Sequence, residues 1–223
     1  MEITWYGHSC FRLTERSLAT VVTDPYDYKQ IGYEPLKLKG DIITVSHNTP
    51  GHNFVSAVKG DSHLIDGPGE FEIGGVFITG IQTNGHTKKT AEEPRNTMFL
   101  FDYNGINILH LGDVNRVPTQ TEVEAIGPVH VALVPVGGGG SLNAIKATEV
   151  ISLLEPNIVI PMHYGTPAFA NTTAKLDPLS KFLKEMGLTD VEPVPSLKIP
   201  NANSLPDETR VVVLEYSKNN NAS

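Results

Sequence analysis

The chain has 223 residues, of which 39% are hydrophobic, a formal net charge of −8 and a single cysteine, Cys10. A chain of this length can bury roughly 70% of its unfolded surface in one domain, and one cysteine excludes internal disulfides and cysteine-only metal sites. The acidic balance disfavours general nucleic-acid binding, and the absence of an apolar run near ~20 residues or of a secretion signal predicts a cytoplasmic protein without a membrane span.

The first half of the sequence is predicted to be rich in β-strands. Short apolar runs indicate strands at 3–6, 9–13, 20–23, 42–45 and 76–81. A short helix is expected just before Gly60, and the glycine-rich segment 66–75 is typical of turns. The polar segment 84–96 has no apolar periodicity, so we expect an exposed loop that could act as a lid.

The second half alternates strands with helices. Strands are predicted at 129–136, 157–161 and 210–216. Helices are predicted from the Thr119 capping box to Gly127, over 147–154, and from the N-cap Asp177 with Pro178 in the first turn to Gly187. This β-α-β order places helices on a sheet face. We expect one domain over 1–217 and a disordered tail over 218–223.

Four apolar runs end on, or shortly before, a side chain that can bind a metal. His47 follows the run at 41–46, His86 follows 76–85, Asp113 follows 106–112, and His163 follows 157–162. Strand ends that converge on one sheet edge would bring these side chains together. Imidazole and carboxylate are ligands that zinc and similar divalent ions prefer.

The order of these motifs resembles the metallo-β-lactamase superfamily. The motifs that carry the likeness are Asp24-Pro25, 46–52, His86, 111–113 and 161–164. The start at 7–11 (GHSCF) is similar to the branch of small metal-dependent hydrolases that includes ascorbate-6-phosphate lactonase. The resemblance implies an α/β (α+β) fold, an αββα sandwich of two mixed β-sheets with helices on the outer faces.

The resemblance also implies a ligand set. In the family pattern H-x-H-x-D-H the outer histidines correspond to His47 and His52, but Thr49 replaces the middle histidine and Gly51 replaces the aspartate. By this correspondence the metal ligands would be His47, His52, His86, Asp113 and His163. One metal would use His47, His86 and Asp113, and a second would use His52, Asp113 and His163.

The two replacements predict one metal ion or fewer per chain, zinc or manganese. Two divalent ions ~3.5–4 Å apart repel by on the order of 18 kcal/mol at an effective dielectric of 20. Asp113 is the only carboxylate left in the matching set to offset that repulsion, and losing a ligand should weaken metal binding at least ~10–100-fold.

Several further residues allow two interpretations. Asp24 could orient a ligand histidine or cap its own turn, and His8 could face the site or form a hydrogen-bonded turn histidine. The glycines at 137–140 could bind an anion through their N–H groups or make a tight reversal. Arg116 and the cations Lys88, Lys89 and Arg95 could meet an anionic substrate or be solvated surface residues.

Together these features predict a metal-dependent hydrolase of an ester, lactone or phosphoester. The metal would lower the pKa of a water, with Asp113 as the central ligand and a catalytic proton acceptor. The expected partner is a small molecule that could be anionic, and a homo-oligomer is compatible with the sequence. The alternative is a catalytically silent protein that keeps a vestigial metal site and serves as a binding or assembly module.

Overall fold

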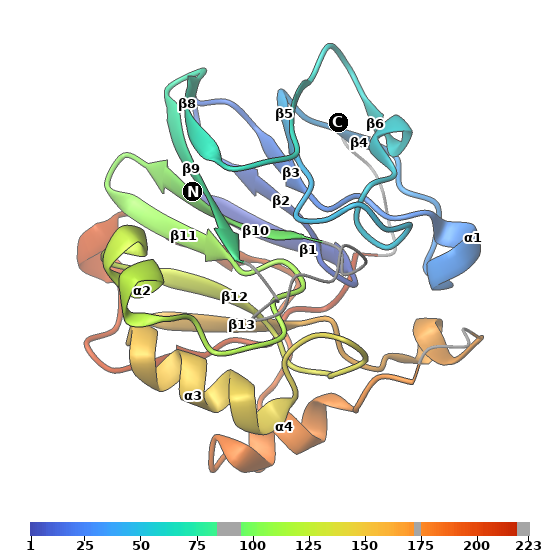
Figure 1. Ribbon diagram of the computed structural model, residues 1–223, viewed down its shortest axis with the longest axis vertical. Coiled ribbons are helices and arrows are strands. Elements are labelled where there is room, and N and C mark those ends of the chain that lie inside the picture. The colour runs from blue at the N-terminus through green and yellow to red at the C-terminus, as the bar shows by residue number, and fades with distance from the viewer. Residues whose placement is uncertain (84–94, 172–174, 218–223) are drawn as a thin grey trace.

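Two mixed β-sheets lie face to face in the computed structural model, which describes residues 1–83, 95–171 and 175–217 (Figure 1). The first sheet has the order β14-β1-β2-β3-β5-β7: β1 (Glu2–Gly7), β2 (Cys10–Thr14), β3 (Val21–Thr23), β5 (Ile42–Thr44), β7 (His63–Ile65) and β14 (Leu197–Lys198). The second has the order β15-β13-β12-β11-β10-β9-β8: β8 (Gly69–Ile73), β9 (Val76–Thr83), β10 (Asn96–Tyr103), β11 (Ile106–His110), β12 (Val131–Pro135), β13 (Ile158–Met162) and β15 (Arg210–Val211).

Parallel pairing brings several strand ends to one edge of the sandwich. β3, β5 and β7 are parallel neighbours in the first sheet, and β11, β12 and β13 are parallel neighbours in the second. The carboxyl ends of parallel neighbours lie at the same sheet edge. The segments that follow β3, β5, β11 and β13 therefore begin close to one another.

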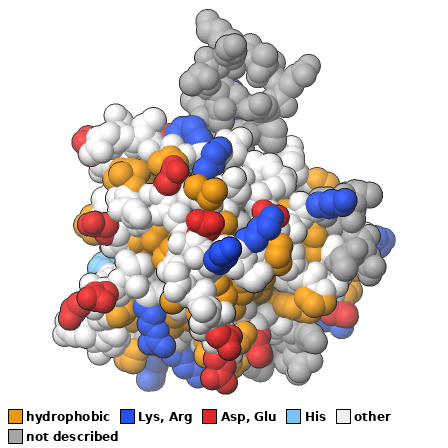
Figure 2. All heavy atoms as spheres, turned by 90° about the horizontal axis from the view of Figure 1, so that it is seen from below, with side chains coloured by type: hydrophobic (Ala, Val, Ile, Leu, Met, Phe, Trp, Pro, Cys, Tyr) orange, Lys and Arg blue, Asp and Glu red, His pale blue; other side chains and the backbone are white. Residues whose placement is uncertain are grey.

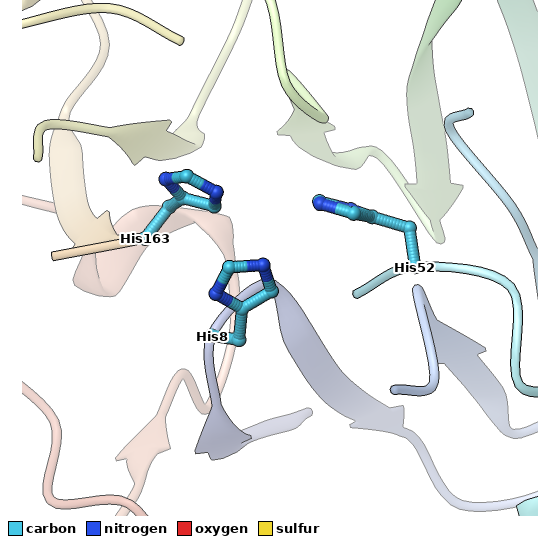
Figure 3. A group of neighbouring side chains, drawn as sticks. All are labelled: His8, His52 and His163. Carbon is cyan, nitrogen blue, oxygen red and sulfur yellow. The ribbon is translucent and has the colours of Figure 1, made fainter. Parts of the chain in front are cut away.

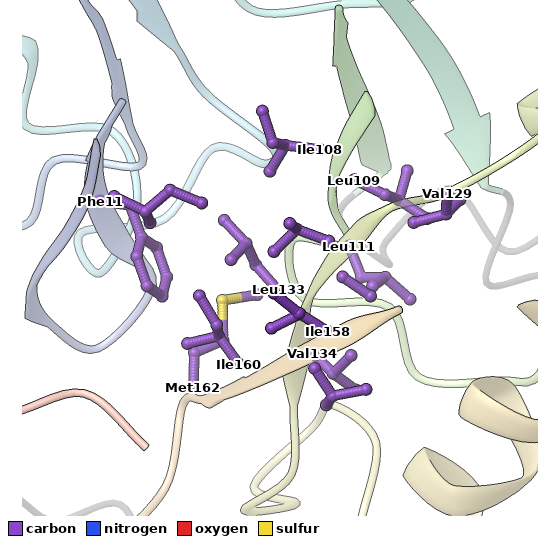
Figure 4. Close-up of a cluster of buried hydrophobic side chains, with 14 of the residues drawn as sticks. Phe11, Ile108, Leu109, Leu111, Val129, Leu133, Val134, Ile158, Ile160 and Met162 are labelled. Atoms are coloured by element: carbon purple, nitrogen blue, oxygen red, sulfur yellow. The ribbon is translucent and has the colours of Figure 1, made fainter. Parts of the chain in front are cut away.

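The core between the sheets is formed by alternate side chains of the strands. Ile3, Trp5 and Phe11 of the first sheet are fully or almost fully buried against the second. Figure 4 shows Phe11 across from a cluster of aliphatic side chains that includes Ile108 and Met162. Burying one such side chain contributes ~1.5–3 kcal/mol, so this layer is the main source of stability for the sandwich.

Helices cover the outer face of the second sheet, as predicted. They are α2 (Gln120–Ile126), α3 (Ala144–Leu154) and α4 (Leu179–Glu185), and α3 and α4 lie beneath β12 and β13 in Figure 1. Thr119 forms the expected capping box with Glu122. α4 differs in one detail, because Pro178 rather than Asp177 is its N-cap and the Asp177 carboxylate pairs with Lys181 Nζ at 2.5 Å.

The outer face of the first sheet is covered mainly by irregular chain. A short helix, α1 (Tyr28–Ile31), and the two-stranded sheet of β4 (Leu38–Lys39) and β6 (Val58–Lys59) pack over buried Tyr26 and Leu36. The short helix predicted before Gly60 is present as a 3-10 helix over Val55–Ala57. It ends before Val58, because this β-branched residue begins β6, which pairs with Leu38.

Two further predictions of local structure need correction. The segment 66–75 is not all turn, because 69–73 form β8 in a hairpin with β9 through Gly74 and Gly75, whose φ values are 55° and 78°. A Gly-Gly pair between strand-forming residues is typical of a β-hairpin, and the prediction of turns over the whole segment did not use this signal. The predicted strand 210–216 leaves the sheet after β15, and Val194 N–H then donates to Val213 O at 2.9 Å.

Other predictions lie outside the described residues. These include most of the predicted loop, over 84–94, with His86, Lys88 and Lys89, and the tail over 218–223. The single domain over 1–217 stays a prediction.

Within the described ranges no helix is long and apolar enough to cross a membrane. Acidic and basic side chains are interspersed on the face shown in Figure 2, so that face has no uniform charge.

Candidate metal centre

Three strand ends and one loop bring four of the predicted metal ligands to one place. His47 follows β5, Asp113 follows β11 and His163 follows β13, while His52 lies at the end of the His47 loop. Asp113 Oδ2 is 3.6 Å from His47 Nε2, and Asp113 Oδ1 is 3.3 Å from His163 Nε2. Ligand atoms of His47, His52 and Asp113 lie within 4.8 Å of one another. His86, the fifth predicted ligand, lies outside the residues that the structure describes.

The loop that presents Asp113 is shaped by a glycine and an asparagine. Gly112 has φ 62°, and a Cβ there would overlap Asn96 Oδ1 and the Ser46 side chain. Asn96 Oδ1 accepts from Asp113 N–H at 2.8 Å, and Asn96 Nδ2 donates to Leu111 O at 3.0 Å. The close approach that only glycine allows therefore fixes the backbone of Asp113.

Asp24 orients His52. The Asp24 carboxylate is fully buried and accepts from Ser46 N–H at 2.7 Å, Ser46 Oγ at 2.6 Å and His52 Nδ1 at 2.8 Å. With Nδ1 of His52 engaged, its Nε2 remains available as a ligand atom. Of the two interpretations left open by the sequence, the structure therefore favours a residue that orients a ligand histidine.

His110 supports the same region, although the sequence analysis did not single it out. It is fully buried, its Nε2 donates to Ser9 O at 2.9 Å and its Nδ1 accepts from Gly112 N–H at 3.1 Å. Both ring nitrogens are thus used by the backbone. A signal was present, since a histidine within the apolar run 106–111 must be buried and paired.

Ser141 sets the tautomer of His163. Ser141 Oγ donates to Gly138 O at 2.9 Å and lies 3.2 Å from His163 Nδ1. Because its one proton goes to Gly138, the serine oxygen accepts from His163 Nδ1–H, which leaves a lone pair on Nε2. Gly138 also donates its N–H to Leu142 O at 2.9 Å, so this glycine serves the tight reversal rather than an anion site.

His8 faces the candidate centre. It lies in the turn between β1 and β2, is buried, and its ring centroid is 4.2 Å from that of His163 and 5.0 Å from that of His52 (Figure 3). His8, Asp24 and His163 have φ values of 51°, 40° and 52°. Backbone in the left-handed region is costly for these residue types and is concentrated at functional sites.

The two replaced positions also lie at the site. Thr49 Oγ1 is 2.9 Å from His47 Nε2, the ring nitrogen that faces Asp113. Gly51 lines the same cavity as His8 and His52. Thr49 therefore engages a nitrogen of the predicted ligand His47 instead of adding a further ligand atom.

Burial keeps most of these imidazoles neutral. It lowers the pKa of His47 to about 4, with a further contribution from the charge of His52. Burial, followed by the charge of His163, holds the pKa of His8 well below its usual value. Burial also lowers the pKa of His163, against the opposing charge of Asp113. These rings are neutral at pH 7, the state in which imidazole binds metal.

The two carboxylates remain ionised. Burial opposes ionisation of Asp113, but the neighbouring histidines, His163 first, lower its pKa overall. Burial likewise opposes ionisation of Asp24, and the charges of His52 and His110 outweigh it. Burial would lower the pKa of His52, but the charge of Asp24 and the hydrogen bond to it raise that pKa. Asp113 is thus the anionic group of the predicted ligand set.

The donor set fits a divalent cation. His163 Nε2 lies 3.3 Å from Asp113 Oδ1, and each of these atoms directs a lone pair toward the other. Asp113 Oδ1 is also buried without a hydrogen-bond partner in the described part of the chain. Facing acceptors repel unless a proton or a cation lies between them. A carboxylate surrounded by imidazoles is the ligand chemistry of zinc and manganese sites.

Two adjoining cavities open beside these residues. One, of about 490 Å³, is lined by His8, His47, His52, Asp113 and His163 among others. The second, of about 560 Å³, shares His47 and includes Asn48, Asn53 and Arg95 in its wall. Arg116, by contrast, is engaged by Glu122 through hydrogen bonds of 2.6 and 2.7 Å. Among these residues Arg95 is better placed than Arg116 to meet a ligand.

Comparisons with known proteins give consistent matches. Residues 2–163 match the family model described as beta-lactamase superfamily domain. A UPF0173 protein of Pyrococcus furiosus is 30% identical in an alignment of 193 residues that covers 74% of this chain and 84% of the relative. A UPF0173 metal-dependent hydrolase of Carboxydothermus hydrogenoformans is 26% identical over 195 residues, with 74% of this chain and 85% of the relative covered.

The fold has a similar counterpart among solved structures. A protein of Thermotoga maritima, described as a candidate Zn-dependent hydrolase of the metallo-beta-lactamase superfamily, is 37% identical with a TM-score of 0.76. The match covers 96% of this chain and 97% of that protein. This extends the likeness beyond residues 2–163 to almost the whole chain.

Proposed function

This chain belongs to the beta-lactamase superfamily, and from that premise we propose that it is a metal-dependent hydrolase of an ester, lactone or phosphoester. Relatives whose names include metal-dependent hydrolase support the reaction type. The observation that carries the proposal is the pair of facing acceptors, Asp113 Oδ1 and His163 Nε2, beside the imidazoles of the cluster. The finer resemblance to ascorbate-6-phosphate lactonase stays a prediction.

The residues of the chain have separate roles in this proposal. His47, His52, Asp113 and His163 would hold zinc or manganese, with His86 as a further predicted ligand. A divalent ion bound there supplies a Lewis acid that lowers the pKa of a water and polarises the oxygen of the bond to be cleaved.

Two carboxylates support that chemistry in different ways. Asp113 is ionised and open to the cavity, so it can accept a proton from the attacking water. Asp24 fixes His52 from behind through its hydrogen bond to Nδ1, and is itself held by two hydrogen bonds from Ser46.

The cavities favour a small polar substrate. Asn48 and Asn53 offer hydrogen bonds, and Arg95 can pair with an anionic group, in the cavity that adjoins His47. Asp66 in the same wall limits the net positive charge of that cavity. We therefore propose a small molecule with at most one anionic group near Arg95.

Hydrolysis assays with generic substrates test the proposal. The protein is assayed with a nitrophenyl ester, a simple lactone and a nitrophenyl phosphodiester after loading with Zn²⁺ or Mn²⁺, and again with chelator. We expect metal-dependent turnover of at least one substrate and a loss of ~10²–10⁴-fold in Asp113→Asn. Asp190→Asn, at an exposed position, is the control. No turnover above that of free metal with any substrate would contradict the proposal.

A second candidate function follows from Thr49. Its hydroxyl occupies His47 Nε2 at 2.9 Å, which favours a vestigial centre in a catalytically silent binding or assembly module. Elemental analysis of protein purified without chelator separates the two candidates. Hydrolysis requires a bound divalent ion, whereas a silent module needs none and would show neither metal nor turnover.

A further inference from the structure

We propose that His8 is a metal ligand that completes, with His52 and His163, a three-imidazole site for a single divalent ion. This deepens the proposed function and rests on it, since it concerns the same cavity and the same kind of ion. It assigns a direct role to a residue whose sequence context in a turn left open a purely structural, hydrogen-bonded histidine.

The first observation is an unsatisfied nitrogen. His8 is only 4% exposed, and its Nδ1 is buried with no hydrogen-bond partner in the described part of the chain. A buried polar atom without a partner costs ~1–3 kcal/mol, and a turn histidine that served the fold would use this nitrogen to bond the backbone. His110 does so with both of its ring nitrogens.

The second observation is convergence. One ligand atom each from His8, His52 and His163 lies within 4.8 Å of the others, and all three residues are buried. Figure 3 shows the three rings around a common space, although they come from three separate segments of the chain. Three histidines are a ligand set of catalytic zinc, and Asp113 Oδ1, 3.3 Å from His163 Nε2, lies beside them as a further donor.

The backbone holds His8 in this position. His8 O accepts from Trp5 Nε1 and from His163 N–H, each at 3.1 Å, so the two histidine turns are joined directly. The ring of Phe169 stacks on that of His8 at 5.7 Å with an interplanar angle of 10°. The His8 ring is therefore positioned before any ion binds, and binding would not have to order it.

Gly51 provides the space that His8 occupies. A Cβ built at Gly51 would lie 2.8 Å from His8 Nε2, closer than real Cβ atoms approach. The backbone of Gly51 does not have a positive φ, so its conformation does not require glycine. The close approach of His8 explains the glycine instead. In the pattern that this chain resembles, an aspartate ligand stands at this position, and here an imidazole fills the same place.

The test measures metal affinity directly. Zn²⁺ is titrated calorimetrically into wild type and His8→Gly, a change that suits φ 51°, and Co²⁺ absorption reports the ligand field. We expect His8→Gly to bind Zn²⁺ at least ~10–100-fold more weakly, because a ligand is lost. Added imidazole should enter the open cavity and restore part of the affinity and the Co²⁺ spectrum. His63→Ala, an exposed histidine, is the matched control.

The outcomes separate this inference from the proposed function. If folded His8→Gly binds Zn²⁺ with an affinity within twofold of wild type, His8 is not a metal ligand. That result leaves the proposed hydrolase function intact. Wild type that binds Zn²⁺ through His8 without hydrolysing any substrate overturns the function alone. Wild type that binds no Zn²⁺ overturns both.

A crystal structure of zinc-loaded wild type covers the case in which the variant does not fold. Zinc at ~2.0–2.1 Å from a His8 nitrogen supports the inference. Zinc bound elsewhere in the cavity, with His8 beyond bonding distance, overturns it.

Discussion

Asp24 Oδ2 lies 2.8 Å from His52 Nδ1 in a fully buried pair, and this contact fixes which nitrogen of His52 faces the cavity. Asp24 itself is held by the backbone and hydroxyl of Ser46, directly before the proposed ligand His47. The carboxylate therefore couples the geometry of two proposed ligands. It also raises the basicity of His52, which strengthens that ring as a ligand.

Replacement of Asp24 by asparagine should weaken metal binding without removing a ligand. An amide accepts more weakly than a carboxylate and can present only one oxygen, so His52 loses its charged partner. We expect Zn²⁺ affinity to fall ~10–100-fold in calorimetric titration. Asp190→Asn is the exposed control. Equal affinity in the folded Asp24→Asn protein would show that His52 is not oriented by this contact.

The shared position of His52 predicts a single metal ion per chain. His52 belongs both to the group with His47 and Asp113 and to the group with His8 and His163. Its Nδ1 is engaged by Asp24, so it has one nitrogen to offer and cannot bind two ions at once. Elemental analysis after extensive dialysis should give about one divalent ion per chain or fewer. A value near two would refute the argument.

Much of this centre could be predicted because the strand ends are visible in the sequence. The apolar runs before His47, Asp113 and His163 form β5, β11 and β13, and the structure brings these residues together with His52. The role of His8 could not be assigned, because its contact with Gly51 joins segments 43 positions apart that no local pattern relates.

The remaining errors have similar physical causes. Val58 is spaced for a helix with Val55, but tertiary pairing with Leu38 outweighs that spacing. The covering of the first sheet by α1, β4 and β6 was not predicted, because these elements are only two to four residues long. Such short elements are specified by the surface they cover rather than by their own periodicity.

The pair Arg116–Glu122 predicts a pH-dependent contribution to stability. The hydrogen bond from Arg116 lowers the pKa of Glu122, against a smaller opposing effect of burial. Since the folded-state pKa lies below the unfolded value, the stabilisation is present above about pH 4.5 and is lost as pH falls through the folded pKa. Its size is about 1 kcal/mol or less, because the pair is partly exposed.

Urea unfolding of Glu122→Gln at two pH values measures this contribution. Wild type should be more stable than the variant at pH 7, and the difference should shrink at pH 3. Glu124→Gln, an exposed neighbour on α2, should show a smaller difference at pH 7. A gap between wild type and Glu122→Gln that is the same at both pH values would contradict the assignment.

Restoring an aspartate at Gly51 should succeed only if His8 is also changed. A Cβ at Gly51 would lie 2.8 Å from His8 Nε2, and the His8 ring cannot move freely between Phe169 and His163. The single change Gly51→Asp should therefore destabilise the fold by overpacking, typically by ~1–3 kcal/mol. His8→Gly removes the ring, and the double variant should recover much of that stability.

Zinc titration of the same variants then tests exchange of one ligand for the other. The double variant His8→Gly with Gly51→Asp should bind Zn²⁺ more tightly than His8→Gly alone, because a carboxylate enters the space left by the imidazole. Adding Thr49→His should raise the number of bound ions toward two, since it supplies a further imidazole beside His47. Urea unfolding also measures how well Gly51→Asp is tolerated with and without His8. Equal tolerance in the two backgrounds would mean that the two side chains do not compete for one space, and the proposed replacement of an aspartate by His8 would be wrong.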